Sequence, residues 1–150
     1  GLFRAIQNIN NAQQELFVKK VKESLCNLPG KTVGVLGLSY KPNTDDMREA
    51  PSINIIQKLQ EEHVRIKAYD PEAMSNARAI LKDVEYCKTP YEAAKGSDAL
   101  LMVTEWDEFK NLDFARLKKL LKQPIVIDGR NIYDPRQMSK LGFVYRGVGR

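Results

Sequence analysis

Three basic side chains and one aromatic ring are the residues whose types could do chemistry together. Lys41 and Arg48 lie in one polar stretch with Tyr40, and Arg130 lies in another stretch far along the chain. Arginine offers phosphate oxygens a bidentate fork, and lysine offers a point charge. If these residues meet in one crevice, they are suited to a diphosphate, and Tyr40 could stack on a base. Each charge-assisted hydrogen bond would contribute on the order of 1.5–3 kcal/mol.

The alternative is that these cations form surface salt bridges, which contribute little to stability. The aspartates available for such pairs are Asp45, Asp46, Asp70 and Asp128. Position along the chain does not decide between a ligand site and surface ion pairs, so both interpretations stay open.

The elements that would position these residues follow from the hydrophobic pattern. Short apolar runs predict strands at 32–38, 64–70, 84–86, 99–103 and 125–128. Amphipathic stretches predict helices at 52–62, 72–82, 90–95 and 114–121. After Asn131 we expect irregular chain, with a last apolar piece at 143–145. Strands that alternate with helices predict an α/β fold, a doubly wound, Rossmann-like parallel sheet of five to six strands.

A long helix is expected before this sheet, over residues 2–28, and Pro29-Gly30 should end it. Apolar or small residues recur there at helical spacing: Leu2, Ala5, Ile9, Ala12 and Leu16, then Phe17, Val21, Leu25 and Leu28. Other faces are apolar too, so more than one neighbour should bury the helix. Its pattern starts at once, without a cap or an initiator Met, so we expect a piece of a longer chain.

The topology would bring the basic residues together. Ligands of open parallel sheets bind beyond the carboxyl ends of the strands. The stretch 39–48 follows the first predicted strand and is longer than the usual two to six residues of such a turn. Arg130 follows the last predicted strand, at the same edge of the sheet. We therefore expect a binding site at this edge.

A dinucleotide fingerprint is a competing interpretation. Gly34 and Gly37 lie in the first strand region, and Asp70 ends the second strand, as in the outline of a Rossmann NAD site. The G-x-G-x-x-G spacing is absent, and the next helix begins about a dozen residues too late to cradle pyrophosphate. A free-standing NAD-binding module therefore remains the weaker alternative.

Composition and scattered residues exclude several other classes. The net charge of +5, from 24 Lys+Arg and 19 Asp+Glu, is small for a nucleic-acid binder. No apolar run approaches the ~20 residues of a membrane helix, and no secretory leader is visible. The two cysteines, Cys26 and Cys87, indicate a reducing, cytoplasmic location and are expected to be inert. We expect His63, the only histidine, at the surface, Trp106 packed under a loop, and no metal site or complete catalytic constellation.

Several motifs in register resemble the C-terminal, UDP-binding domain of the UDP-glucose/GDP-mannose dehydrogenase family, the UDP-glucose 6-dehydrogenases in particular. They are INNAQQ at 9–14, GLSYKPNTDDMREAPS at 37–52, YDP at 69–71, TEWDEF at 104–109, IDGRNIYD at 127–134 and GFVYRGVGR at 142–150. The resemblance covers essentially the whole chain. It implies that residues 1–28 are the end of a long central, dimerisation helix and that residues 31–150 form the UDP-binding domain.

The resemblance also implies roles for the basic residues. Tyr40, where the family usually has Phe, and Lys41 would contact the UDP-sugar, as would Arg130 of the DGRN motif. Arg48 would reach NAD held by another domain.

The parent enzyme would oxidise UDP-glucose to UDP-glucuronate with two NAD. Its N-terminal NAD-binding domain and catalytic cysteine lie outside these residues, which contain no catalytic residue of their own and should be inactive alone. The resemblance further implies a homo-oligomeric parent. The alternatives are a domain of a GDP-mannose or other nucleotide-sugar dehydrogenase, and a purely structural module that dimerises through its helix.

Overall fold

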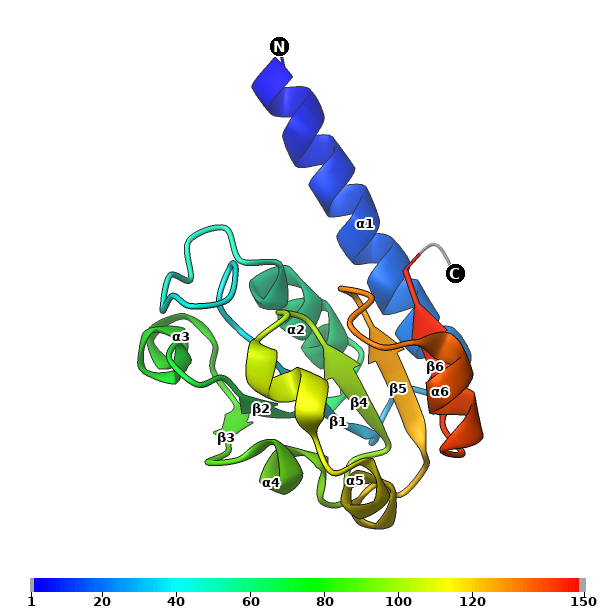
Figure 1. Ribbon diagram of the computed structural model, residues 1–150. Coiled ribbons are helices and arrows are strands. Elements are labelled where there is room, and N and C mark those ends of the chain that lie inside the picture. Colours follow the sequence, from blue (N-terminus) through cyan, green and yellow to red (C-terminus); the bar gives the residue numbers. More distant parts are fainter. Residues whose placement is uncertain (1, 149–150) are drawn as a thin grey trace.

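A six-stranded, wholly parallel sheet forms the centre of the molecule, as a computed structural model of the chain shows (Figure 1). The structure describes residues 2–148, with side chains from residue 11 onward. The strand order is β3-β2-β1-β4-β5-β6. The strands are β1 Thr32–Leu36, β2 Arg65–Tyr69, β3 Val84–Tyr86, β4 Ala99–Met102, β5 Ile125–Asp128 and β6 Val144–Gly147. The order reverses between β1 and β4, which is where doubly wound sheets bind ligands.

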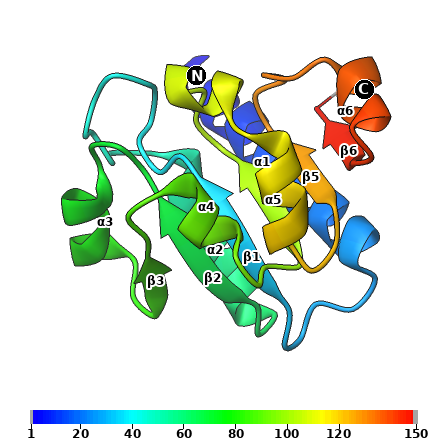
Figure 2. The ribbon, with the colours of Figure 1, turned by 60° about the horizontal axis from the view of Figure 1, so that its bottom comes forward.

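Helices cover both faces of the sheet, which confirms the doubly wound arrangement. They are α1 Leu2–Leu25, α2 Pro51–Glu61, α3 Met74–Ile80, α4 Pro90–Ala94, the 3-10 helix η1 Asp107–Asn111, α5 Phe114–Leu120 and α6 Pro135–Lys140. Alternate strand residues enter two cores: Leu101 belongs to the core that includes residues of α1, α2 and α3, and Leu100 to the core that includes residues of α4, α5 and α6. Figure 2 shows α4 and α5 over one face, with α1 and α2 behind the sheet. Burial on both faces explains the near-continuous apolar strands.

The long first helix ends at Leu25, before the predicted end at residue 28. Cys26 has a φ of 64°, a left-handed conformation that stops the helix ahead of Pro29. The predicted stripe is buried from Phe17 through Leu28, whereas Leu16 is 55% exposed. The side chains of Leu2, Ala5 and Ile9 lie outside the described part of the chain, so their predicted burial is not tested. The second half of α1 packs on the domain, and the backbone of the helix runs away from the sheet toward its N-terminus (Figure 1).

The C-terminal region is regular, which corrects the expectation of irregular chain after Asn131. Asp134 caps α6 by accepting the Arg136 N–H at 3.0 Å, and Pro135 occupies the first helical position. Val144 then pairs with Ile125 in the sheet. A six-residue helix is too short to reveal a 3.6-residue period, and the same is true of the five-residue η1, which we also did not predict. The sheet therefore has the larger of the predicted strand numbers.

Candidate binding cleft

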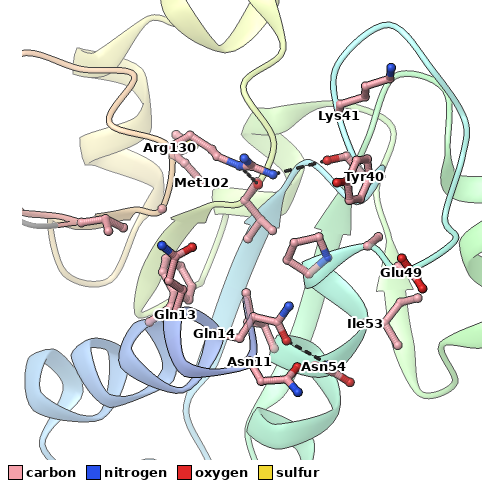
Figure 3. Close-up of a pocket in the computed structure, with 17 residues that line it drawn as sticks. Asn11, Gln13, Gln14, Tyr40, Lys41, Glu49, Ile53, Asn54, Met102 and Arg130 are labelled. Carbon is pink, nitrogen blue, oxygen red and sulfur yellow. Dashed lines mark hydrogen bonds between the residues drawn. The ribbon is translucent and has the colours of Figure 1, made fainter. Parts of the chain in front are cut away.

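A cleft of 560 Å³ lies beyond the carboxyl ends of β1, β4 and β5 (Figure 3). Tyr40 and Lys41 from the loop after β1 line it together with Arg130 from the loop after β5. Much of the remaining lining comes from α1 and the first turn of α2, with Met102, Val103 and Gly129 at the sheet edge. This volume is typical of small-molecule sites. The structure thus brings three of the four predicted site residues to one cavity.

Arg130 is held by acceptors from two loops. Its Nε donates to the Val103 carbonyl at 2.9 Å, and its Nη2 donates to the Tyr40 carbonyl at 3.3 Å. The Glu105 carboxylate, 3.3 Å from Nε, completes the set. A guanidinium has five N–H donors, so Nη1 and one hydrogen of Nη2 remain for a ligand. Arg130 therefore has an ion pair, but with Glu105 and not with any of the four aspartates considered above.

Asp128 shapes the loop that carries Arg130. This buried carboxylate accepts the Arg130 N–H at 2.9 Å through Oδ1. Its Oδ2 accepts the Ile132 N–H at 2.7 Å, the Tyr133 N–H at 3.2 Å and the Tyr145 hydroxyl at 2.7 Å. Backbone amides and a hydroxyl thus occupy both oxygens, which makes Asp128 a structural anchor.

Asp70 plays the same part at the end of β2. Its Oδ2 accepts the backbone N–H groups of Leu38 at 2.7 Å and Ser39 at 3.1 Å, and also Trp106 Nε1 at 3.2 Å. Its Oδ1 accepts the N–H groups of Glu72 at 2.9 Å and Ala73 at 2.8 Å. The bonds to Leu38 and Ser39 fix the base of the Tyr40–Lys41 loop. Trp106, the third donor to Oδ2, is buried in the core with Leu36 and Phe109.

This arrangement does not fit NAD bound by the β1–β2 edge in the Rossmann manner. Asp70 is fully buried with both oxygens occupied, so it cannot accept ribose hydroxyls. A Cβ on Gly37 would lie 2.5 Å from the Thr104 backbone nitrogen. The close approach that this glycine permits is therefore to the Thr104 backbone of the neighbouring loop.

The loop that carries Tyr40 and Lys41 is anchored at its base and open at its tip. The Thr104 hydroxyl donates to the Ser39 carbonyl at 2.7 Å, and the Tyr40 N–H donates to the Asp46 carbonyl at 2.9 Å. The Tyr40 side chain remains 45% exposed, and Lys41 is exposed beside it. A ring face and an ammonium group are thus available at the rim of the cleft.

Arg48, the fourth predicted site residue, does not line the cleft. Its Nε and Nη2 each lie 3.1 Å from a carboxylate oxygen of Asp46, and its side chain is 89% exposed. This hydrogen-bonded guanidinium lowers the pKa of the Asp46 carboxyl. For Arg48, the surface ion pair that we considered as the alternative is present.

The amide residues of α1 and α2 at the cleft are functional candidates that we did not predict. Asn11, Gln13 and Gln14 line it from α1, and Asn54 lines it from α2. Asn54 Nδ2 donates to Gln14 Oε1 at 2.9 Å. A signal was present, because Gln14 continues the helical spacing of the buried stripe where an apolar residue is typical.

The first turn of α2 also faces the cleft, through Ala50 and Pro51. The N-cap residue, Ala50, makes no side-chain cap hydrogen bond, and Pro51 begins the helix. Backbone N–H groups at a helix N-terminus carry partial positive charge. This end of α2 therefore adds to the positive potential of Lys41 and Arg130.

The other candidate residues lie away from the cleft. His63 is exposed, as predicted, and Cys26 is exposed directly after the C-terminal end of α1. Burial raises the pKa of the Cys87 thiol to about 11. Over the described residues there is no cluster of His, Cys, Asp and Glu that could hold a metal ion. Nor does that part of the chain include a helix long and apolar enough to cross a membrane.

Comparison with known proteins gives a consistent result. Residues 34–135 match the model of the UDP-glucose/GDP-mannose dehydrogenase family, UDP binding domain. A UDP-glucose 6-dehydrogenase of Rhizobium meliloti (strain 1021) is 43% identical over 141 residues, which are 94% of this chain and 32% of that protein. One from Bacillus subtilis (strain 168) is 45% identical over 150 residues, 99% of this chain and 34% of that protein. The chain spans about a third of the length of these relatives.

Solved structures agree with the sequence relatives. A UDP-glucose dehydrogenase from Pyrobaculum islandicum superposes with a TM-score of 0.82 at 32% identity, over 97% of this chain and 31% of that one. A GDP-mannose dehydrogenase from Pseudomonas aeruginosa superposes with a TM-score of 0.64 at 16% identity, over 95% of this chain and 32% of that one. The second match supports the shared fold alone.

Proposed function

The chain belongs to the UDP-glucose/GDP-mannose dehydrogenase family, and from this premise we propose that its cleft binds the UDP part of a UDP-sugar. The observation that carries the proposal is the convergence of Tyr40, Lys41 and Arg130 on one cavity. Lys41 and the free N–H groups of Arg130 hold the diphosphate, with the first turn of α2 adding positive potential. Tyr40 stacks on a ring of the ligand.

The parent protein is, on this proposal, an NAD-dependent UDP-glucose 6-dehydrogenase that converts UDP-glucose to UDP-glucuronate with two NAD. When bound to the parent's N-terminal domain, NAD would serve as the hydride acceptor. The β1–β2 edge described here does not fit it, and Arg48 is the residue that we assign to reach it. Both cysteines of this chain are free, which is compatible with a cytoplasmic parent.

The assembly of the parent is part of the same proposal. We assign α1 to the end of the central, dimerisation helix of a homo-oligomer and residues 31–150 to the UDP-binding domain. The 150-residue chain binds UDP weakly because other walls of the site come from the remaining domains, and it has no dehydrogenase activity alone.

Titration of the 150-residue chain with UDP, followed by NMR and calorimetry, tests the proposal. We expect shifts at Lys41 and Arg130. Lys41→Ala and Arg130→Ala should each weaken UDP binding by about tenfold or more, because each variant loses one charge-assisted contact. Lys119→Ala, on the exposed side of α5, is the matched control and should leave the affinity unchanged. No response to millimolar UDP would overturn the proposal.

A further inference from the structure

The amides on α1 and α2 form a second chemical surface in the cleft. Asn11 and Gln14 are three residues apart on α1, so they share one face of the helix. Asn54 approaches them from α2 and donates to Gln14 Oε1 at 2.9 Å. Figure 3 shows this group at the opposite side of the cleft from Lys41 and Arg130. One wall of the cleft is therefore cationic, and the other is neutral and polar.

Gln14 is costly at this position unless its amide group has a use. It is only 9% exposed and sits one turn before Phe17 in the stripe that packs on the domain. An apolar side chain there would bury more hydrocarbon surface and would need no hydrogen bonds. The bond from Asn54 occupies the Gln14 carbonyl oxygen, while the Gln14 amide nitrogen faces the cleft (Figure 3).

The free groups of this pair offer a defined pattern. Gln14 Nε2 carries hydrogen-bond donors and Asn54 Oδ1 is an acceptor, and neither group carries net charge. A neutral ring that carries an acceptor next to a donor fits such a pattern. The N–H and C=O groups on the edge of a pyrimidine base are one example, and adjacent hydroxyls of a hexose are another.

We propose that Asn11, Gln14 and Asn54 form an amide subsite that binds a neutral, hydrogen-bonding ring of the ligand, while Lys41 and Arg130 bind its phosphates. The proposal rests on the proposed function, which supplies the ligand. It gives α1 a direct part in ligand binding in addition to its role as a connecting helix. The ring is either the base or the sugar of the nucleotide sugar, and the ligands of the test separate these two sources.

Binding of inorganic pyrophosphate, UDP, CDP and UDP-glucose to the 150-residue chain tests the subsite. Gln14→Leu removes the donors and Asn54→Leu removes the acceptor. Gln57→Leu changes an exposed amide on α2 outside the cleft and is the matched control. Each subsite variant should lower the affinity for the affected nucleotide roughly 3- to 10-fold, which is the effect of about one neutral hydrogen bond. Pyrophosphate affinity should not change, since the cations are intact.

The pattern of losses identifies the ring. If the subsite binds the base, the wild-type chain prefers UDP to CDP, whose donor and acceptor are exchanged, and the variants lose that preference. If it binds the sugar, the variants lose only the additional affinity of UDP-glucose over UDP. If these residues only hold α1 and α2 together, the substitutions would lower the free energy of unfolding without changing the ratio of nucleotide affinity to pyrophosphate affinity.

Two results would overturn the subsite. In the first, Gln14→Leu and Asn54→Leu bind the nucleotides as tightly as the control Gln57→Leu does. In the second, the two subsite variants lose affinity for pyrophosphate and for the nucleotides by the same factor. Either result leaves the proposed function standing, because the wild-type chain still binds UDP. A wild-type chain that binds neither pyrophosphate nor any nucleotide overturns the proposed function and the subsite together.

Discussion

Replacement of Asp70 by Asn should lower the free energy of unfolding far more than the similar size and shape of the two side chains suggests. Four backbone N–H groups and Trp106 Nε1 donate to the two carboxylate oxygens, three to Oδ2 and two to Oδ1. An asparagine has one acceptor oxygen, so its NH₂ group must face at least two of these donors. Each lost hydrogen bond to a charged group costs about 1.5–3 kcal/mol. We therefore expect a loss of about 3 kcal/mol or more in the free energy of unfolding.

Urea unfolding followed by far-UV circular dichroism measures this loss without using Trp106, which is itself a partner of Asp70. Asp113→Asn is the matched control. Asp113 caps α5 by accepting the Arg116 N–H at 3.1 Å, and asparagine caps helices equally well, so stability should not change. A loss of less than about 1 kcal/mol for Asp70→Asn, with weakened NADH binding, would refute the structural role and favour a ribose-binding one.

Three further predictions concern residues near the sheet. Gly37 has a φ of +93°, and a Cβ there would meet Thr104 at 2.5 Å, so Gly37→Ala should lower the free energy of unfolding in urea by about 2–4 kcal/mol. At pH 8 a thiol reagent should modify the exposed Cys26 quickly in the folded chain. Cys87 is buried and its pKa is raised to about 11, so it should react only when the chain unfolds, and equal rates for the two thiols would contradict this. Burial raises the pKa of Tyr69 above its ordinary 10.0, so the contribution of this residue to stability is complete below pH 10 and is lost progressively above it. The free energy of unfolding, measured in urea, should therefore be lower at pH 11 than at pH 9, and Tyr69→Phe should reduce this difference.

The sequence was most informative where burial is complete. β5 has the bounds predicted from its apolar run, and β4 differs by one residue, because strands covered on both faces must be apolar throughout. Once the strands are placed, the rule for parallel sheets brings the loops after β1 and β5 to the same edge. The hydrogen bond from Arg130 to the Tyr40 carbonyl, across 90 residues of chain, shows that this inference was correct.

The α1 wall of the cleft could not be predicted because it depends on how that helix docks. A helical pattern shows which face is buried but not which loop lies opposite it, so Gln14 resembles an irregularity in the stripe until Asn54 is placed against it. The role of Asp70 was obscured for a related reason. An aspartate at the end of a second strand has the same sequence position whether it accepts ribose hydroxyls or backbone amides, and only its burial separates the two roles.

The buried aspartates also explain how the cleft keeps its positive charge. Asp70 follows β2 and Asp128 ends β5, at the sheet edge where the cations lie, yet their oxygens accept N–H groups of the loop backbones. They organise the loops that carry Lys41 and Arg130 without pairing with either side chain. Of the carboxylates near Arg130, Glu105 is the one that pairs with it, at the Nε side, which leaves the Nη side toward the cleft. An anion that enters the cleft therefore replaces water at these cations, and it does not have to break their pairing with Asp70 or Asp128.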